Sequence, residues 1–421
     1  MQSVNSKQFF YFCAIALFLS FPCISWARVV SDSCLPQLVQ EVIQNNPQIK
    51  SAYDRWYAAK YNIPQSRSLP DPNVDLGYTK MSGNADMNAN KSREQMMGVS
   101  QEIPFPSKLF VRGDVATSES ERAKEVYDAT RVSVIAQLKQ KYYELYFINK
   151  SIEISEKNQL ILENMQKSAS ANYRVGKASQ QDMFRAQSEI SRLLMRLVML
   201  RQERDVAQAD INRLLNRSLD MPIPTPSKLS ISPLKFNLAQ YNYLMDNRSP
   251  QILAQEKSVE KSRQTVRLSK LDYAPDIDVG VDKLRDTAMH TQGYQVMVSA
   301  SIPLYASSKQ NNEVRESLSH YNAEQEDLYA IHRDLSFQVK DSFLQAQRSS
   351  ELIRLLQHTL IPQSTLTFLS SQASYGVGKV DFLTWLNSLL TLQDNELDLE
   401  NEIVQHEKSI AQLEEITGAS L

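Results

Sequence analysis

The stretches Tyr173-Arg-Val-Gly-Lys177 and Tyr375-Gly-Val-Gly-Lys379 decide the fold, because each interrupts a long, helix-favouring sequence with very little glycine. Gly176 and Gly378 lie 202 positions apart, which is close to half of the 421 residues. Self-similarity at such a period indicates an internal duplication. The sequence therefore predicts two similar halves, each built around a helical hairpin that turns at the glycine.

Other short segments recur in the same order in both halves. The matching pairs are residues 46–49 and 249–252, residues 72–77 and 275–280, and residues 103–104 and 302–303. Asn46 and Ser249 are suitable N-caps, each followed by a proline, so a helix is expected to begin at each position. Each half is therefore expected to carry the same set of elements, with differences in length taken up by loops.

The first 27 residues are predicted to be a secretory signal peptide. Lys7 precedes an apolar run from Phe9 to Phe21, and the small residues Ser25 and Ala27 occupy the −3 and −1 positions of a cleavage site before Arg28. A membrane anchor is the alternative, but a bilayer span needs about 20 apolar residues. No later apolar run is as long, so strands are expected to make any membrane crossing.

Amino-acid composition limits the kinds of site and partner that the chain can have. Cys34 is the single cysteine of the mature chain, which excludes an internal disulfide and a cysteine metal site. The formal net charge of −2 argues against nucleic acid as a partner. The five histidines are isolated in the sequence, so we expect neither a metal nor a cofactor.

Two strand pairs are predicted, at residues 73–81 with 94–103 and at residues 276–285 with 292–302. In the first strand Val74, Leu76 and Tyr78 alternate with polar or small residues. This alternation fits a transmembrane barrel with lipid outside and water inside, and it also fits a soluble sheet with one solvated face. Because even an eight-stranded barrel is filled by side chains, a lumen would require several chains.

Long helical hairpins are predicted at residues 108–216 and 306–418. Apart from Gly113 and Pro362, no strong breaker interrupts about 60 residues in either copy, or roughly 90 Å of helix. From Ile190 to Leu214 apolar residues recur with the 3.5 period of coiled coils. Arg204 interrupts this seam as a packing irregularity or as a partner across the hairpin, and His406, at the matching position, is expected to be a packing or pairing residue.

The predicted organisation is a first repeat at residues 28–216, a linker at 217–245 and a second repeat at 246–421. Four prolines between residues 222 and 233 make the linker stiff and extended. Since both return helices end well short of the strands, the linker is expected to wrap the helices midway along their length.

The chain resembles the TolC-like outer membrane efflux proteins over nearly all of its mature length. The segments that carry the resemblance are residues 45–47, 70–72, 101–106 with Lys108, 173–177 with Asp182, Pro275, 302–303 and 375–379. Their order and duplication are specific, although each is short. Pro70-Asp-Pro72 and Gln101-Glu-Ile-Pro-Phe-Pro106 are most similar to the branch that serves heavy-metal and related cation efflux.

The resemblance implies a mainly α-helical chain with a small β part that assembles as a homotrimer. Three sets of four strands would form a twelve-stranded barrel in the lipid of a Gram-negative outer membrane, and the coiled-coil hairpins would form a tunnel across the periplasm. Substrate would pass from an inner-membrane pump of the RND type through a periplasmic adaptor and out of the cell. Conduction would be passive, so no catalytic or cofactor-binding residue is expected.

By the same resemblance, the hairpin tips near residues 173–182 and 375–384 dock the adaptor and form the gate. The candidate residues are Arg174, Val175, Gly176, Lys177, Ser179, Asp182, Val377, Gly378, Lys379 and Asp381. Arg174, Lys177 and Lys379 are expected to pair with Asp182 or Asp381 on neighbouring helices and hold the entrance shut. Some family members carry a hydrophobic residue where this chain has Lys177 and Lys379, which leaves the choice of adaptor open.

Other classes of protein fit less well. A soluble periplasmic adaptor would have one hairpin and a glycine-rich lipoyl-like β domain. A structural coiled-coil protein would not need the duplicated strand pairs. An enzyme would be expected to show a nucleophile motif, a phosphate-binding loop or clustered histidines and carboxylates, and the sequence shows none of these.

Overall fold

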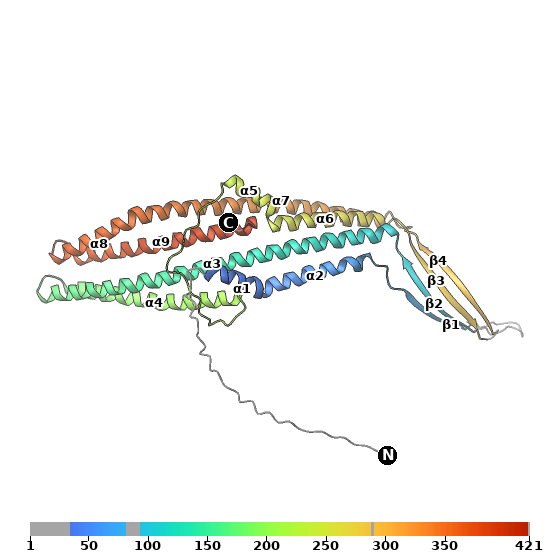
Figure 1. The fold of residues 1–421 in the computed structure, drawn as a ribbon, viewed down its shortest axis with the longest axis horizontal. Helices are drawn as coiled ribbons and strands as arrows, with labels where there is room; N and C mark the ends of the chain where they lie inside the picture. The colour runs from blue at the N-terminus through green and yellow to red at the C-terminus, as the bar shows by residue number, and fades with distance from the viewer. Residues whose placement is uncertain (1–33, 81–92, 288–289, 420–421) are drawn as a thin grey trace, which may run out of the picture.

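The computed structural model describes residues 34–80, 93–287 and 290–419. The predicted signal peptide at residues 1–27 lies outside this range. The described chain is elongated, with a sheet at one end, two hairpin tips at the other and the connecting segments near the middle (Figure 1). It is mainly helical with four antiparallel strands, which confirms the predicted fold class.

The elements follow one order in each repeat. In chain order they are α1 (Cys34–Asn45), α2 (Pro47–Arg67), β1 (Asn73–Lys80), β2 (Arg93–Ile103), α3 (Pro106–Arg174), α4 (Gln180–Leu214), α5 (Leu238–Arg248), α6 (Pro250–Leu271), β3 (Asp276–Asp286), β4 (Thr291–Ser301), α7 (Gln310–Leu355), the π-helix η1 (Leu356–Leu360), α8 (Ile361–Gly376) and α9 (Phe382–Thr417). Helix α3 alone has 69 residues, which is about 100 Å at 1.5 Å per residue.

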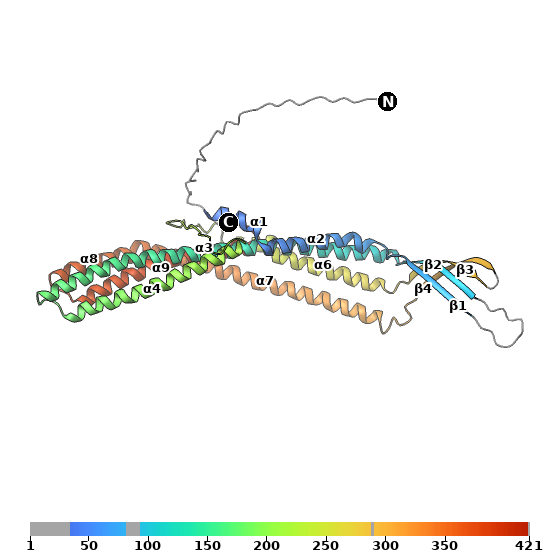
Figure 2. The ribbon, with the colours of Figure 1, turned by 90° about the horizontal axis from the view of Figure 1, so that it is seen from below.

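The four strands form one antiparallel sheet in the order β1-β2-β3-β4. Helices α2, α3, α6 and α7 connect to these strands and pack side by side in the corresponding order (Figure 2). Toward the tips, the hairpin of α3 and α4 packs against the hairpin of α8 and α9 through α3 and α9. No helix within the described ranges is both long and apolar enough to cross a membrane.

The strand register sorts the sheet into an apolar face and a polar face. Val74 pairs with Val99, Val99 with Val281 and Val281 with Val296, so a row of valines crosses all four strands. These valines are 49% to 68% exposed. The next positions form a polar row of Asp75, Gly98, Asp282 and Gln295, which points to the opposite face because side chains alternate along a strand.

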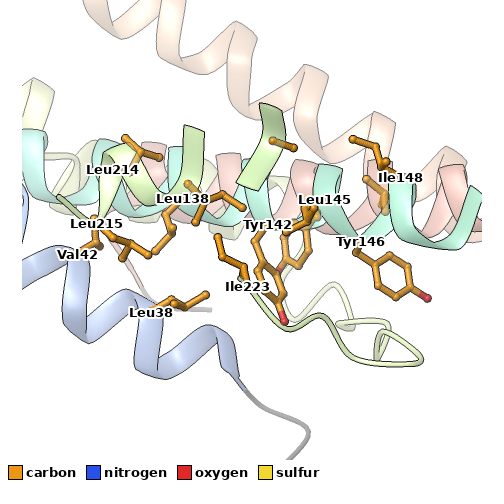
Figure 3. Close-up of a cluster of buried hydrophobic side chains, with 14 of the residues drawn as sticks. Leu38, Val42, Leu138, Tyr142, Leu145, Tyr146, Ile148, Leu214, Leu215 and Ile223 are labelled. Carbon is orange, nitrogen blue, oxygen red and sulfur yellow. The ribbon is translucent and has the colours of Figure 1, made fainter. Parts of the chain in front are cut away.

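The main hydrophobic core lies midway along the molecule. Leu138, Tyr142 and Leu145 of α3 pack there with Leu214 at the end of α4 and with Ile223 of the linker (Figure 3). A second cluster lies near the tips, and a third joins α5, α7 and α9. The linker therefore contributes side chains to the core as well as connecting the two repeats.

Asn46 caps α2 as expected. Its side-chain oxygen accepts hydrogen bonds from the N–H groups of Gln48 at 2.8 Å and Ile49 at 3.2 Å, and its amide donates to the carbonyl of Leu214 at 2.8 Å. The prediction for Ser249 is confirmed in part, because Ser249 occupies the N-cap position of α6. Helix α6 does begin after it, but the Ser249 hydroxyl makes no capping bond and has no hydrogen-bond partner among the described residues.

Three further details differ from the sequence predictions. The linker was expected to extend to residue 245, but α5 begins at Leu238, where Asn237 and Gln240 form a capping box. The second hairpin was expected from residue 306, but turns precede α7, which begins at Gln310. A π-helix over Leu356–Leu360 interrupts the outgoing helix immediately before Pro362, whose ring and missing N–H disturb the preceding turn.

The coiled-coil seam of α4 is largely buried, as its 3.5 period predicts, and Ala207 and Ile211 continue it beyond Arg204. The proposed partner for Arg204 across the hairpin is wrong. Its guanidinium lies 3.0 Å from the carboxylate of the adjacent Asp205. The arginine therefore forms an ion pair at the surface with a residue of its own helix.

Candidate functional site at the hairpin tips

The two hairpins turn at the end of the molecule opposite the sheet (Figure 1). Helix α3 ends at Arg174 and α4 begins at Gln180, while α8 ends at Gly376 and α9 begins at Phe382. The structure thus brings both sets of predicted tip residues to one end of the chain, although they are about 200 positions apart in the sequence.

Both turns use the same backbone geometry. Gly176 has a φ of 73° and Gly378 a φ of 75°. Gly176 donates to the carbonyl of Tyr173 at 2.9 Å and Lys177 to that of Asn172 at 2.8 Å. This is a Schellman motif with a left-handed glycine, which satisfies the last carbonyls of the helix. The same two bonds recur in the second turn, so the duplicated Val-Gly-Lys sequence has one structural explanation.

The helices that leave the two turns begin differently. The carboxylate of Asp381 accepts a hydrogen bond from the N–H of Thr384 at 3.0 Å and caps α9. Hydrogen bonds from Thr384 hold the pKa of Asp381 below its usual value. Ser179 occupies the equivalent cap position of α4 but makes no side-chain capping bond, and Asp182 lies within the first turn. Asp381 therefore has a local structural role that Asp182 does not share.

An aromatic cluster packs against the second turn. The rings of Tyr375 and Trp385 stack at 5.0 Å between centroids, and Phe382 meets Trp385 edge-to-face at 6.1 Å. Ala169 of α3 and Ala186 of α4 are buried in the same cluster, so it joins both hairpins. Sequence reasoning missed these residues, and the available signal was three aromatics within eleven positions of the glycine turn.

The charged tip residues do not form the expected pairs within one chain. Arg174, Lys177 and Lys379 are exposed, and none of the ion pairs found across residues 34–80, 93–287 and 290–419 joins any of them to Asp182 or Asp381. The expected pairs are therefore absent among the described residues of one chain, and the gate stays a prediction for an assembly of several copies. Beside the charges, Val175 and Val377 are exposed at matching positions.

The described residues contain no group of three or more histidine, cysteine or acidic side chains that could hold a metal ion. Two open grooves lie beside α2 and α3, away from the tips, and Lys261 and Leu268 of α6 also line the first of them.

A family model described as outer membrane efflux protein matches residues 38–217 and 243–419. The chain belongs to this family. The two matched segments cover both repeats and leave out most of the linker. Membership places the protein in the outer membrane and among efflux channels.

Individual relatives agree with this assignment. The outer membrane protein TolC of Vibrio cholerae is 21% identical over 96% of this chain and 95% of its own length. Solved structures that share the fold include VceC of Vibrio cholerae, with a TM-score of 0.79 and 16% identity over 92% of this chain and 96% of that one. Another is the open state of MtrE of Neisseria gonorrhoeae, with a TM-score of 0.76 and 14% identity over 91% of this chain and 89% of that one.

Proposed function

We propose that three copies of this chain form one outer membrane channel that passively conducts substrate from a periplasmic adaptor and an inner-membrane pump to the exterior. The observation that carries the proposal is the sheet. Its exposed valine row faces one side and its polar row the other, as expected for strands between lipid and a water-filled lumen.

The edges of the sheet support assembly from several copies. Among the described strands, β1 pairs with β2 alone and β4 with β3 alone, so each chain presents two open edges. Unpaired edges invite further strand pairing, and closure into a barrel removes them. Pairing β4 of one copy with β1 of the next would close the sheet, and three copies would supply twelve strands.

The hairpin tips are proposed to dock the adaptor and to gate the tunnel. Val175 and Val377 are exposed apolar residues beside exposed lysines, which suits a contact surface with an apolar centre and a polar rim. Since none of these tip charges pairs with another among the described residues, the gate would rely on pairs between subunits, linking Arg174, Lys177 or Lys379 of one copy to Asp182 or Asp381 of another.

The mechanism needs no catalytic group in this chain. The pump, proposed to be of the RND type, would supply the energy, while the channel contributes a continuous water-filled path and a gate. Heavy-metal cations as cargo stay a prediction that rests on residues 70–72 and 101–106. Comparing survival of a strain with and without the gene in graded copper or silver salts would test it, and unchanged survival would count against this cargo.

Channel activity is tested by inserting the purified protein into planar lipid bilayers. We expect discrete conductance steps when the full-length protein is inserted. Bilayers that stay silent, with protein shown to be inserted and folded, would contradict the proposed function.

A further inference from the structure

His406 and Arg204 occupy equivalent positions of the duplicated seam, 202 residues apart, and an acidic residue follows each of them. The two pairs are used differently. Arg204 and Asp205 pair with each other at the surface at 3.0 Å. His406 and Glu407 are only 2% and 3% exposed. The pair in the second repeat is therefore buried, whereas the pair in the first repeat lies at the surface.

The inter-repeat linker covers the buried pair at Ser232. Glu407 accepts hydrogen bonds from the Ser232 N–H at 2.6 Å and from its hydroxyl at 2.9 Å. Nε2 of His406 lies 2.7 Å from the Ser232 carbonyl. Two consecutive side chains of α9 thus contact all three polar groups of one linker residue. Pro233 follows, which keeps Ser232 away from helical conformations.

The other ring nitrogen of His406 also faces a carbonyl. Nδ1 lies 2.9 Å from the carbonyl of Ala346 on α7. A carbonyl can only accept, and a neutral imidazole carries one N–H, so a neutral ring can bond only one of the two oxygens. Both bonds form together only when the ring is an imidazolium. The carboxylate of Glu407 bonds the same linker residue, so a negative charge lies on the other polar groups of Ser232.

We propose that His406, Glu407 and Ser232 form a proton-dependent clasp that fastens the inter-repeat linker to α9 and α7. When the ring loses a proton, one of its two carbonyls loses its donor and the linker is held less tightly. Histidine is the side chain whose charge ordinarily changes between pH 5 and 8. The clasp would therefore tighten the middle of the molecule at low pH and loosen it as pH rises.

Other charged and titratable groups lie on the elements that surround the clasp. On α9, Glu402 accepts from Ser349 at 2.7 Å and lies 3.8 Å from Arg348 of α7. Burial, and next the charge of Glu407, raise the pKa of Tyr143 on α3, so this phenol keeps its proton. On α3 the Tyr146 hydroxyl donates to Glu400 of α9 at 2.8 Å. Further charged groups on these elements are Lys408 on α9, Lys340 and Asp341 on α7, and Lys228 and Lys235 on the linker.

Two lysines of the linker allow release of the linker to be measured by proteolysis. Trypsin cleavage after Lys228 and Lys235 reports linker release when opening is faster than cleavage, and new N-termini at Leu229 and Phe236 identify these cuts by mass spectrometry. Rates are measured on the folded full chain between pH 5.5 and 8.5 and divided by the trypsin rate on a peptide substrate at the same pH. We expect the wild-type rate to rise by about ten-fold, the effect of losing one charge-assisted hydrogen bond.

His406→Gln should lose most of the pH dependence, because an amide does not titrate in this range. It should also be cleaved quickly at pH 5.5, because both of its N–H groups are on one nitrogen and the positive charge is gone. Arg204→Gln, at the equivalent position of the first repeat, should match the wild type. Ser232→Ala keeps the backbone contacts and leaves the core unchanged. It should be cleaved faster at every pH and keep the pH dependence.

A corrected wild-type rate that does not change with pH would overturn the clasp, as would a His406→Gln profile equal to that of the wild type. Should His406→Gln fail to fold, the pH profiles of the wild type and Ser232→Ala decide the matter on their own. The test needs no transport, so its failure would leave the proposed channel function untouched.

Discussion

The ammonium of Lys108 lies 2.9 Å from the carboxylate of Asp276, which joins the first turn of α3 to the first residue of β3. The lysine side chain is 4% exposed and also donates to the carbonyl of Ala274 at 3.2 Å. Asp276 accepts a further bond from the N–H of Phe105 at 2.8 Å. The contact therefore ties the two repeats together where helices meet the sheet.

Replacing Lys108 with Met should lower the free energy of unfolding by about 2 kcal/mol, since it leaves charged acceptors without their donor. Lys309→Met is the matched control, because Lys309 lines the same cavity but is exposed. Thermal unfolding followed by circular dichroism compares the two variants. Equal midpoints for both would show that the buried pair contributes little.

Gly378→Ala should destabilise the second turn by about 1 to 2 kcal/mol, the cost of a left-handed conformation for a residue with a side chain. Nothing lies within 4 Å of a Cβ at Gly378 or at Gly376, and only Gly378 has a positive φ. Gly376→Ala should accordingly be neutral or slightly stabilising at the end of α8. Hydrogen exchange of a peptide covering residues 370–385 measures both, and similar protection in the two variants would refute the backbone explanation.

Removing the charges of Asp182 and Asp381 should increase single-channel conductance if intersubunit ion pairs hold the gate shut. Exposed pairs contribute only about 0 to 1 kcal/mol each, but three subunits repeat them. Asn is the preferred replacement because it can cap α9 as Asp381 does. Unchanged conductance together with unchanged closed times would eliminate this gate.

Asp381→Ala separates the cap from the charge. It removes the hydrogen bond to Thr384 as well as the carboxylate, so α9 loses its N-cap. We expect faster hydrogen exchange at the start of α9 in Asp381→Ala than in Asp381→Asn. If the two variants exchange alike, the bond to Thr384 is not what orders this turn.

Stability should fall at acidic pH through Glu119 of α3. A hydrogen bond from Arg122, and further contacts with Lys261 of α6, hold its pKa below the usual value. A lowered pKa contributes stability that is present above the ordinary glutamate pKa and is lost as pH falls from there through the lowered pKa of the folded state. Thermal midpoints at pH 7 and pH 4 should differ less in Glu119→Gln than in the wild type or in the exposed control Glu203→Gln. A full wild-type pH response in Glu119→Gln would contradict this role.

Much of the fold could be predicted because the duplication repeats each local signal. Gly176 and Gly378 mark the turns, and the alternation at Val74 and Leu76 marks a strand, since both signals depend only on neighbouring residues. Helix α5 could also have been found, from the capping box at Asn237.

What could not be predicted depends on distant contacts. Arg204 and His406 have the same place in the repeat, but the linker crosses only the second, and nothing near either residue in the sequence says so. The tip charges are a similar case. Opposite charges at the tips suggest pairs, whereas no such pair forms among the described residues of one chain and Asp381 serves as a cap.

The most direct test of the account is to count subunits in the outer membrane. Cells are fractionated, and the membrane-bound protein is crosslinked and run on gels with and without boiling. We predict that it is found in the outer membrane as a trimer, as required if four strands per chain close into one barrel. A monomer or dimer in the soluble periplasmic fraction would contradict the proposed channel.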